Sequence, residues 1–161
     1  MGTATFVDAH TSEGFDINAF TELVGASQSP AGQYRAMYKG PFTGKNQGWA
    51  DLGVLGTGAS AGNWSAAYAI NDQGLIVGQS TIKVGSVYPT RAFVLSNAGN
   101  PGSQAMLELT GQAWVFQNQQ WYTAASQGWT LISAERINGN NWIVGWGYKS
   151  GQYRAFMLSP R

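Results

Sequence analysis

The chain lacks cysteine, has a single histidine and carries little charge. Of its 161 residues none is Cys, five are Pro, one is His and 11% are charged. The absence of Cys excludes disulfide scaffolds, thiolate zinc sites and cysteine nucleophiles. A single His excludes metal sites that need a histidine pair, and it limits any Ser-His-Asp arrangement to the surroundings of His10. The eight carboxylates are spread singly, so no pair is marked for glycoside hydrolysis. We predict neither enzyme activity nor a metal or other cofactor.

The chain also lacks an excess of charge of one sign and lacks long apolar runs. Nine Lys and Arg stand against eight Asp and Glu, which gives a net charge of +1, and the basic residues are scattered singly. A nucleic-acid partner is therefore not expected. No apolar run approaches the roughly 18 residues of a membrane span, so membrane insertion is not expected either. A length near 150 residues fits one domain with its own core.

What the chain does have is glycine, aromatic residues and short β-branched runs. It contains 22 Gly and seven each of Trp, Tyr and Phe, with 43% hydrophobic residues. Short apolar runs between turn residues favour an all-β fold. The stretch Asp16–Leu23 could by itself form a short helix capped by Asp. The strand candidates are Ala4–Asp8, Leu75–Gln79, Ala92–Leu95, Trp142–Trp146 and Ala155–Leu158.

One pattern of residues occurs three times along the chain. An Ile-Asn pair is followed by Leu or Ile, Val and Gly, and then by Arg, Ala and Met or Phe. The Ile-to-Val step is seven residues in every copy, whereas the Gly-to-Arg step is ten, thirteen or nine. A fixed step followed by a variable one indicates a tight turn and then a loop that tolerates insertion. The copies begin at Ile17–Asn18, Ile70–Asn71 and Ile137–Asn138.

The spacing of the copies predicts four-stranded repeats. Successive copies are 53 and 67 residues apart, within or somewhat above the periods of β-propeller blades. Outer strands are expected at Trp49–Gly53 and Ala105–Leu109, and the third copy lacks one. We therefore predict that an N-terminal strand, about residues 3–9, completes the last blade. The single domain spans residues 1–161, with repeats at about 12–56, 63–110 and 128–161 and an insertion at 111–127.

The repeated motif resembles a known family. The stretch from Ser65 to Gly78, followed by Arg-Ala-Phe and by Trp-x-Asp-Leu-Gly, is similar to the HAF repeat of predicted extracellular bacterial proteins, many of which carry a PEP-CTERM sorting tail. The first copy departs from the pattern, with Thr21 where the others have Gly74 and Asn141. The resemblance implies export and a β-propeller-like fold, and it implies no catalytic residues. No signal peptide follows Met1, so the chain is either cytoplasmic or a mature form. The export that the resemblance implies leads us to expect a mature form of a secreted or cell-surface protein.

The repeated residues have mechanical roles in this interpretation. The Asn at each chain reversal tolerates left-handed backbone angles and bonds to its own neighbouring amides. The Gly in each strand permits close approach of a neighbouring sheet or a bend. The repeated arginines either bond between blades, to carbonyls or to Asp16, Asp72 or Glu135, or form a ring that faces a ligand. The glycines are Gly25, Gly78 and Gly145, and the arginines are Arg35, Arg91 and Arg154.

The insertion before the third repeat carries aromatic and amide residues. A Trp face can stack on a sugar ring while amides bond to its hydroxyl groups. Packing of each Trp in the core or between blades is the alternative, because large aromatic residues are mostly buried. The candidate ligand-binding residues are Trp114, Trp121, Tyr122, Gln119 and Gln120, together with Arg35, Arg91 and Arg154.

The number of repeats bears on the partner. Propellers typically have four to eight blades, so three are too few to close a ring, whereas two chains would supply six. We predict an all-β, β-propeller-like fold that forms a homodimer or a higher assembly. A β-trefoil is the alternative fold, because it also has three repeats and Gln47-Gly-Trp49 and Gln127-Gly-Trp129 echo the Gln-x-Trp motif of trefoil lectins. Two functions remain open: a module that binds a glycan or another extracellular polymer, and a structural subunit of a surface or matrix assembly.

Overall fold

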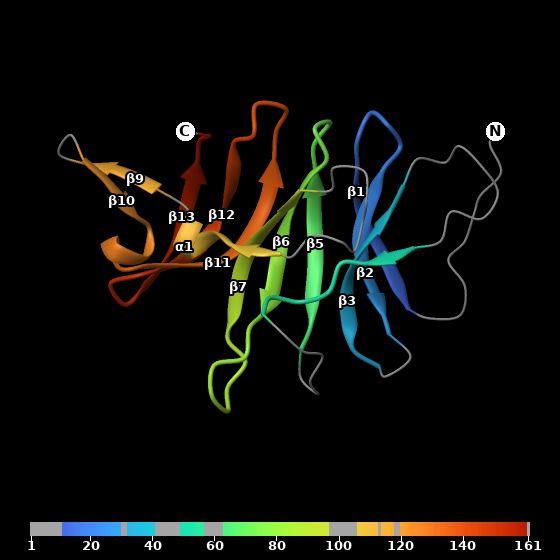
Figure 1. The fold of residues 1–161 in the computed structure, drawn as a ribbon, viewed down its shortest axis with the longest axis horizontal. Coiled ribbons are helices and arrows are strands. Elements are labelled where there is room, and N and C mark those ends of the chain that lie inside the picture. The colour runs from blue at the N-terminus through green and yellow to red at the C-terminus, as the bar shows by residue number, and fades with distance from the viewer. Residues whose placement is uncertain are drawn as a thin grey trace.

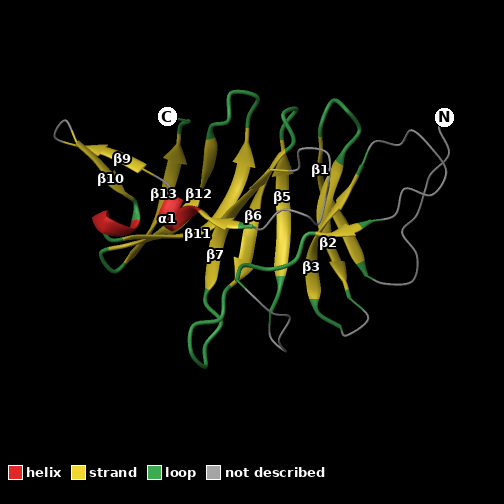
Figure 2. Ribbon diagram, viewed as in Figure 1, coloured by secondary structure: helices red, strands yellow, loops and turns green. Residues whose placement is uncertain are grey.

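The structure is a computed structural model that describes residues 11–29, 32–40, 49–56, 63–96, 106–112, 114–117 and 120–160. Its architecture is all-β, with three antiparallel sheets in a row (Figure 1). Within these residues, helical structure is found in two short pieces between the second and third sheets (Figure 2). The predicted all-β class is thus confirmed for this part of the chain, and each of the three sheets contains one copy of the repeated motif.

Each sheet is a meander in which consecutive strands pair. The first sheet has the order β1-β2-β3-β4, the second β5-β6-β7-β8 and the third β11-β12-β13. The strands of the first sheet are β1 (Ser12–Ile17), β2 (Leu23–Gln28), β3 (Tyr34–Lys39) and β4 (Ala50–Asp51). Those of the second are β5 (Ser65–Ile70), β6 (Leu75–Thr81), β7 (Thr90–Ser96) and β8 (Leu107–Glu108). Those of the third are β11 (Trp129–Ile137), β12 (Ile143–Lys149) and β13 (Gln152–Leu158).

The stretch Asp16–Leu23 is not a helix. Strand β1 ends at Ile17 and β2 begins at Leu23, with a turn between them, as the repeat predicts. The predicted outer strands are present but shortened to two residues each, in β4 and β8. The strand expected near residues 3–9 lies outside the described residues, as does the tail of the chain at Arg161. The third sheet therefore shows three strands in the part described.

The insertion forms a separate hairpin. It comprises α1 (Leu109–Gln112), β9 (Trp114–Gln117), β10 (Gln120–Thr123) and the single 3-10 turn η1 (Ala125–Gln127). Strands β9 and β10 pair only with each other. In Figure 1 this hairpin projects from the end of the row beside the third sheet.

The middle sheet separates two hydrophobic cores. Strand β5 packs on the first sheet, and β11 packs on the second sheet. Because the middle sheet is covered on both faces, Ile76, Val77 and Gly78 are buried without alternation. The first core combines Val24, Ala36 and Tyr38 with Ala67, Ile70, Ile76, Phe93 and Leu95. The second combines Ala69, Val77 and Ala92 with Leu131, Ala134, Ile143 and Phe156.

Candidate functional site

The repeated asparagines organise the turn between the first two strands of each sheet. The Oδ1 atom of Asn71 accepts hydrogen bonds from the backbone N–H of Gln73 at 3.1 Å and of Leu75 at 3.0 Å. The corresponding bonds recur at Asn18 and at Asn138, with lengths of 2.9 to 3.0 Å. The predicted bonds to neighbouring amides are confirmed, whereas the predicted left-handed angle is not, because none of the three Asn residues has a positive φ.

The left-handed residue of each turn lies three positions after the Asn. Thr21 has φ 62°, Gly74 has φ 74° and Asn141 has φ 62°. Gly and Asn adopt this conformation readily, whereas a β-branched residue does so only under strain. The first copy therefore departs from the repeat at Thr21, the position that requires a left-handed backbone conformation.

The same asparagines also join neighbouring sheets, which sequence reasoning did not find. The Nδ2 atom of Asn18 donates to the backbone carbonyl of Asn71 at 3.1 Å, and Nδ2 of Asn71 donates to the carbonyl of Asn138 at 3.1 Å. We call this series the asparagine ladder. Two aspartates add bonds between the first and second sheets, because Asp72 accepts from the N–H of Ala19 at 2.9 Å and Asp16 accepts from that of Ile70 at 3.0 Å. The available signal was that Asn recurs at the same position of each repeat.

The two ends of the asparagine ladder are complementary. The carbonyl of Asn71 accepts from both Gly74 and Asn18, whereas that of Asn18 accepts from Thr21 alone among the residues described. At the other end, the Nδ2 of Asn138 has no protein acceptor in the same set. One end thus has a spare acceptor position and the other has a spare donor.

The repeated glycines face a bulge in the neighbouring strand. A Cβ added at Gly25, Gly78 or Gly145 would overlap a carbonyl oxygen of the first strand in the same sheet. In each sheet this is where the register shifts by one residue, as between Ala67 and Ala69. The predicted close approach is therefore that of a strand within the sheet, at a bend.

The bulged residues of the three sheets lie near one another. The rings of Phe15 and Tyr68 are 5.4 Å apart between centroids. Gln79 donates through Nε2 to the Tyr68 hydroxyl. Burial raises the pKa of Tyr68, and the nearby Glu135 carboxylate raises that pKa further. Glu135 accepts hydrogen bonds from the Ser133 hydroxyl at 2.6 Å and from the Trp146 indole at 3.1 Å.

The third sheet leaves one apolar face uncovered, which we call the open face. Val144 is 41% exposed and Met157 63%, whereas Val24 and Val77, at the equivalent position of the first two sheets, are fully buried. A hollow of about 520 Å³ on this face is lined by Glu135, Val144, Gly145, Trp146, Ala155, Phe156 and Met157. The ring of Tyr153 lies 5.7 Å from Trp146 and 5.4 Å from Tyr148, so an exposed aromatic group continues the face.

The predicted aromatic site is placed on the hairpin of the insertion. Trp114 lies in β9, and Gln120, Trp121 and Tyr122 lie in β10. The strand register pairs Trp121 with Phe116, Tyr122 with Val115 and Trp114 with Thr123. The hairpin thus brings four of the five residues together along the backbone. Their side chains and all of Gln119 lie outside what the structure describes.

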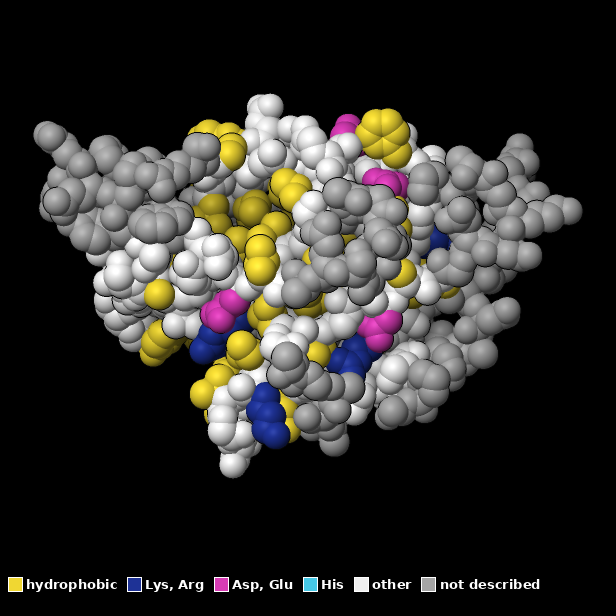
Figure 3. All heavy atoms as spheres, viewed as in Figure 1, with side chains coloured by type: hydrophobic (Ala, Val, Ile, Leu, Met, Phe, Trp, Pro, Cys, Tyr) yellow, Lys and Arg dark blue, Asp and Glu magenta, His cyan; other side chains and the backbone are white. Residues whose placement is uncertain are grey.

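The three repeated arginines bond within their own sheets. Arg35 donates to Gln33 at 3.3 Å and Arg154 donates to Gln152 at 2.7 Å. Arg91 forms an ion pair with Glu108 in the adjacent strand, with 3.2 Å between Nε and Oε1. The carboxylates considered as partners between blades have other donors in the described structure, from backbone amides for Asp16 and Asp72 and from side chains for Glu135. On the face drawn in Figure 3, the charged side chains of the described residues are scattered without a patch of one sign.

Features of catalysis are not assembled in the part described. No group of three or more metal-ligating side chains occurs among these residues, and His10 lies outside them. The sequence contains one Gly-x-Ser-x-Gly motif, at residues 58–62, and these residues also lie outside the described part of the chain. The next element is strand β5, whereas a nucleophile elbow requires a helix after the Ser. No helix in the described ranges is long and apolar enough to cross a membrane.

Comparison of the chain with protein-family models, with curated proteins and with solved structures finds no match.

Proposed function

We propose that the chain is a β-propeller-like structural module that associates with a second copy of itself through the open face of its third sheet. The observation that carries the proposal is the exposure of this apolar face. Its counterparts on the first and second sheets are each covered by the next sheet in the row. An exposed apolar patch of this kind is typical of a protein interaction site.

The first sheet offers a complementary surface. Ile17 is 53% exposed, whereas Ile70, at the same position of the second sheet, is 4% exposed and packs toward the first sheet. A second copy placed with its first sheet on the open face would bury Ile17 against Val144 and Met157. The spare carbonyl position of Asn18 would then accept from Asn138, which continues the asparagine ladder across the interface.

This arrangement joins unlike surfaces. Two copies supply six sheets, within the four to eight blades of closed propellers. A contact between unlike surfaces closes into a ring when the rotation allows it, and otherwise extends into a filament. The resemblance to the HAF repeat supports a bacterial surface or matrix as the setting, and it supports the propeller architecture over the trefoil. Export is part of the proposal on the same ground.

The test is the mass of the assembly in solution at several protein concentrations. Sedimentation or light scattering of the unmodified protein should give a dimer or a larger species. Val144→Asp places a charge beside Glu135 on the open face and should yield the monomer. The matched control is Val87→Asp, because Val87 is 61% exposed in the loop between β6 and β7 and lies outside the open face. A monomeric unmodified protein at the highest concentration contradicts the proposal.

Glycan binding is the second candidate, favoured by the placement of Trp114, Gln120, Trp121 and Tyr122 on one hairpin outside the repeats. Aromatic rings and amides on a neutral surface suit uncharged sugars. A glycan array with Trp121→Ala as the comparison tests it, and the absence of any glycan signal from the unmodified protein contradicts it.

A further inference from the structure

Arg35 and Arg91 occupy the same place in the repeat, but they differ in whether a carboxylate pairs with them. Arg91 is neutralised by Glu108, which stands opposite Phe93 in the neighbouring strand. In the first sheet the residue opposite Met37, and so at the place of Glu108, is Asp51. Its side chain is one methylene shorter than that of Glu.

Asp51 does not form the equivalent ion pair. Its Oδ1 atom accepts a hydrogen bond from the backbone N–H of Gly53 at 2.7 Å. The described structure gives Arg35 a single hydrogen bond, from Nη2 to Gln33 at 3.3 Å. A guanidinium group has five N–H donors, and Arg35 is only 7% exposed. A largely buried cation is therefore left with few partners of its own chain.

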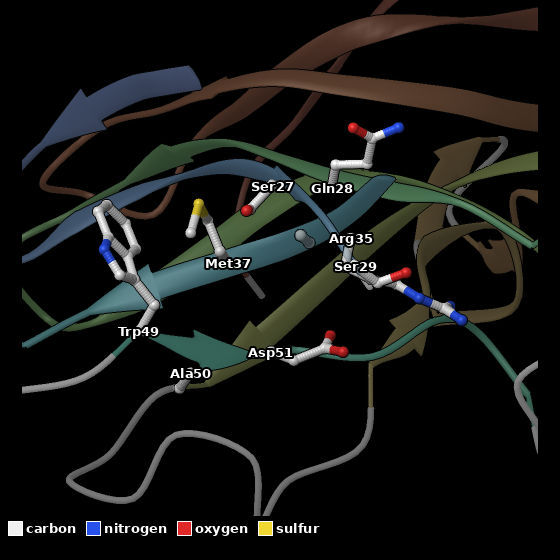
Figure 4. A pocket seen from close by; sticks show the side chains of 9 residues that line it. Ser27, Gln28, Ser29, Arg35, Met37, Trp49, Ala50 and Asp51 are labelled. Atoms are coloured by element: carbon white, nitrogen blue, oxygen red, sulfur yellow. The ribbon is translucent and has the colours of Figure 1, made fainter. Parts of the chain in front are cut away.

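A pocket occupies the space beside this arginine. It measures about 190 Å³, and Figure 4 shows Arg35 and Trp49 near opposite ends of it. Trp49 and Met37 give it an apolar part. The ammonium group of Lys39 lies 5.4 Å from the centre of the Trp49 ring and adds a second positive charge nearby. Among the described residues, Ser27 and Asp51 add polar groups to its lining.

We propose that this pocket binds a carboxylate carried on a sugar ring, as in a hexuronate. The ligand carboxylate takes the place beside Arg35 that Glu108 takes beside Arg91, where a planar guanidinium matches it with two parallel hydrogen bonds. The ring lies against Trp49, and its hydroxyl groups bond to Asp51 and Ser27. The few hydrogen bonds of the buried Arg35 guanidinium favour an acidic ligand over a neutral one. The site is independent of the association through the open face.

The test is calorimetric titration with D-glucuronate and, separately, with D-glucose and with acetate. Glucuronate should bind at least about 10-fold more tightly than either of the others, because only it offers both the charge-assisted bonds and the ring. A uronate oligosaccharide in a further titration distinguishes a polymer from a free sugar acid as the source. Equal affinity for glucuronate and glucose, or no binding of glucuronate, overturns the proposal.

Variants locate the site on the protein. Arg35→Gln should weaken glucuronate binding by about 10- to 100-fold. Arg154→Gln is the matched control, because Arg154 has the same place in the repeat and the same kind of Gln partner but is exposed, and it should leave the affinity unchanged. An unchanged affinity of Arg35→Gln overturns the assignment.

A second variant keeps the proposal open to refutation if Arg35→Gln fails to fold. Asp51→Glu restores the residue found in the second sheet, and its longer side chain should reach Arg35 and close the pocket. The variant should stay folded and lose glucuronate binding by at least about 10-fold. Full affinity in Asp51→Glu contradicts the role assigned to the space beside Arg35.

Discussion

The second sheet is covered on both faces and the third on one, although the two sheets carry nearly the same repeat. Val77 and Val144 hold the same position in that repeat, yet one is fully buried and the other is 41% exposed. The strand that contains Val77 has buried residues in succession, whereas β12 alternates between buried and exposed residues along much of its length. The comparison shows that a repeat position is buried only where another sheet packs on that face. The repeat places apolar residues on both faces of each sheet.

Placing a charge at this valine should give the largest contrast between the two sheets. Val77→Asp buries an unpaired carboxylate and should lower the free energy of unfolding by at least about 4 kcal/mol. Val144→Asp should change the stability of the dilute monomer by less than about 0.5 kcal/mol. Chemical denaturation of both variants measures the difference. A similar loss in both would show that the open face is covered by the chain itself.

Adding a methyl group to the repeated glycines should affect both sheets alike. In Gly78→Ala and Gly145→Ala the new Cβ meets a carbonyl oxygen of the adjacent strand, and the ring of Phe93 or Phe156 lies close by. Each change should cost about 2 to 3 kcal/mol in the free energy of unfolding, because the backbone must move. Thermal unfolding with calorimetry measures this. Unequal losses would mean that packing between sheets, more than the bulge within a sheet, requires the glycine.

Removing the repeated asparagine should distinguish the sheets again, by a smaller amount. Asn71→Ala loses the two bonds of its turn and those that Nδ2 donates to the Asn138 carbonyl and to Asn141. We expect a loss of about 2 to 3 kcal/mol for Asn71→Ala and of about 1 kcal/mol for Asn138→Ala, whose side chain makes only its turn bonds in the part of the chain that the structure describes. Urea titrations at a protein concentration low enough to keep the monomer compare the two. Equal losses would indicate that the ladder contributes nothing to stability.

The smallest expected effect is a gain. Thr21 adopts a left-handed conformation that Gly74 provides in the second sheet, so Thr21→Gly should raise the free energy of unfolding by about 1 kcal/mol. The measurement is the shift of the urea midpoint. Gly74→Thr is the reverse change and should lower the midpoint. A loss of stability in Thr21→Gly would show that the hydroxyl bond of Thr21 to the Phe20 carbonyl outweighs the strain.

Much of the fold could be predicted because the repeat encodes it locally. The fixed step from Ile to Val defines a turn held by the Asn side chain, and the structure contains that turn three times. The helix α1 at Leu109–Gln112 was not predicted, because Leu109 was assigned to the outer strand and the Thr-Gly-Gln that follows it carries no helix pattern. The outer strands were predicted longer than they are, since apolar character alone does not fix where pairing ends.

The candidate sites were predicted less well than the fold. The arginines were singled out correctly as a repeated feature, yet only the pairing of strands shows that Glu108 faces Arg91 and that Asp51 stands in its place in the first sheet. The open face cannot be predicted from the sequence, because the pattern around Val144 and Met157 predicts core residues, as it does for Val77 and Val94. Exposure depends on which sheet lies next in space.

The sequence by itself determined the all-β class, the three repeats and the mechanical roles of the asparagines and glycines. These features follow from contacts within one sheet, and residues close along the chain specify them. The tertiary structure decided which surfaces are covered, where the asparagine ladder ends and which repeated arginine faces a carboxylate. Those features depend on how one sheet packs on another and on which residues of distant segments face each other, and the motif shared by the three copies does not encode them.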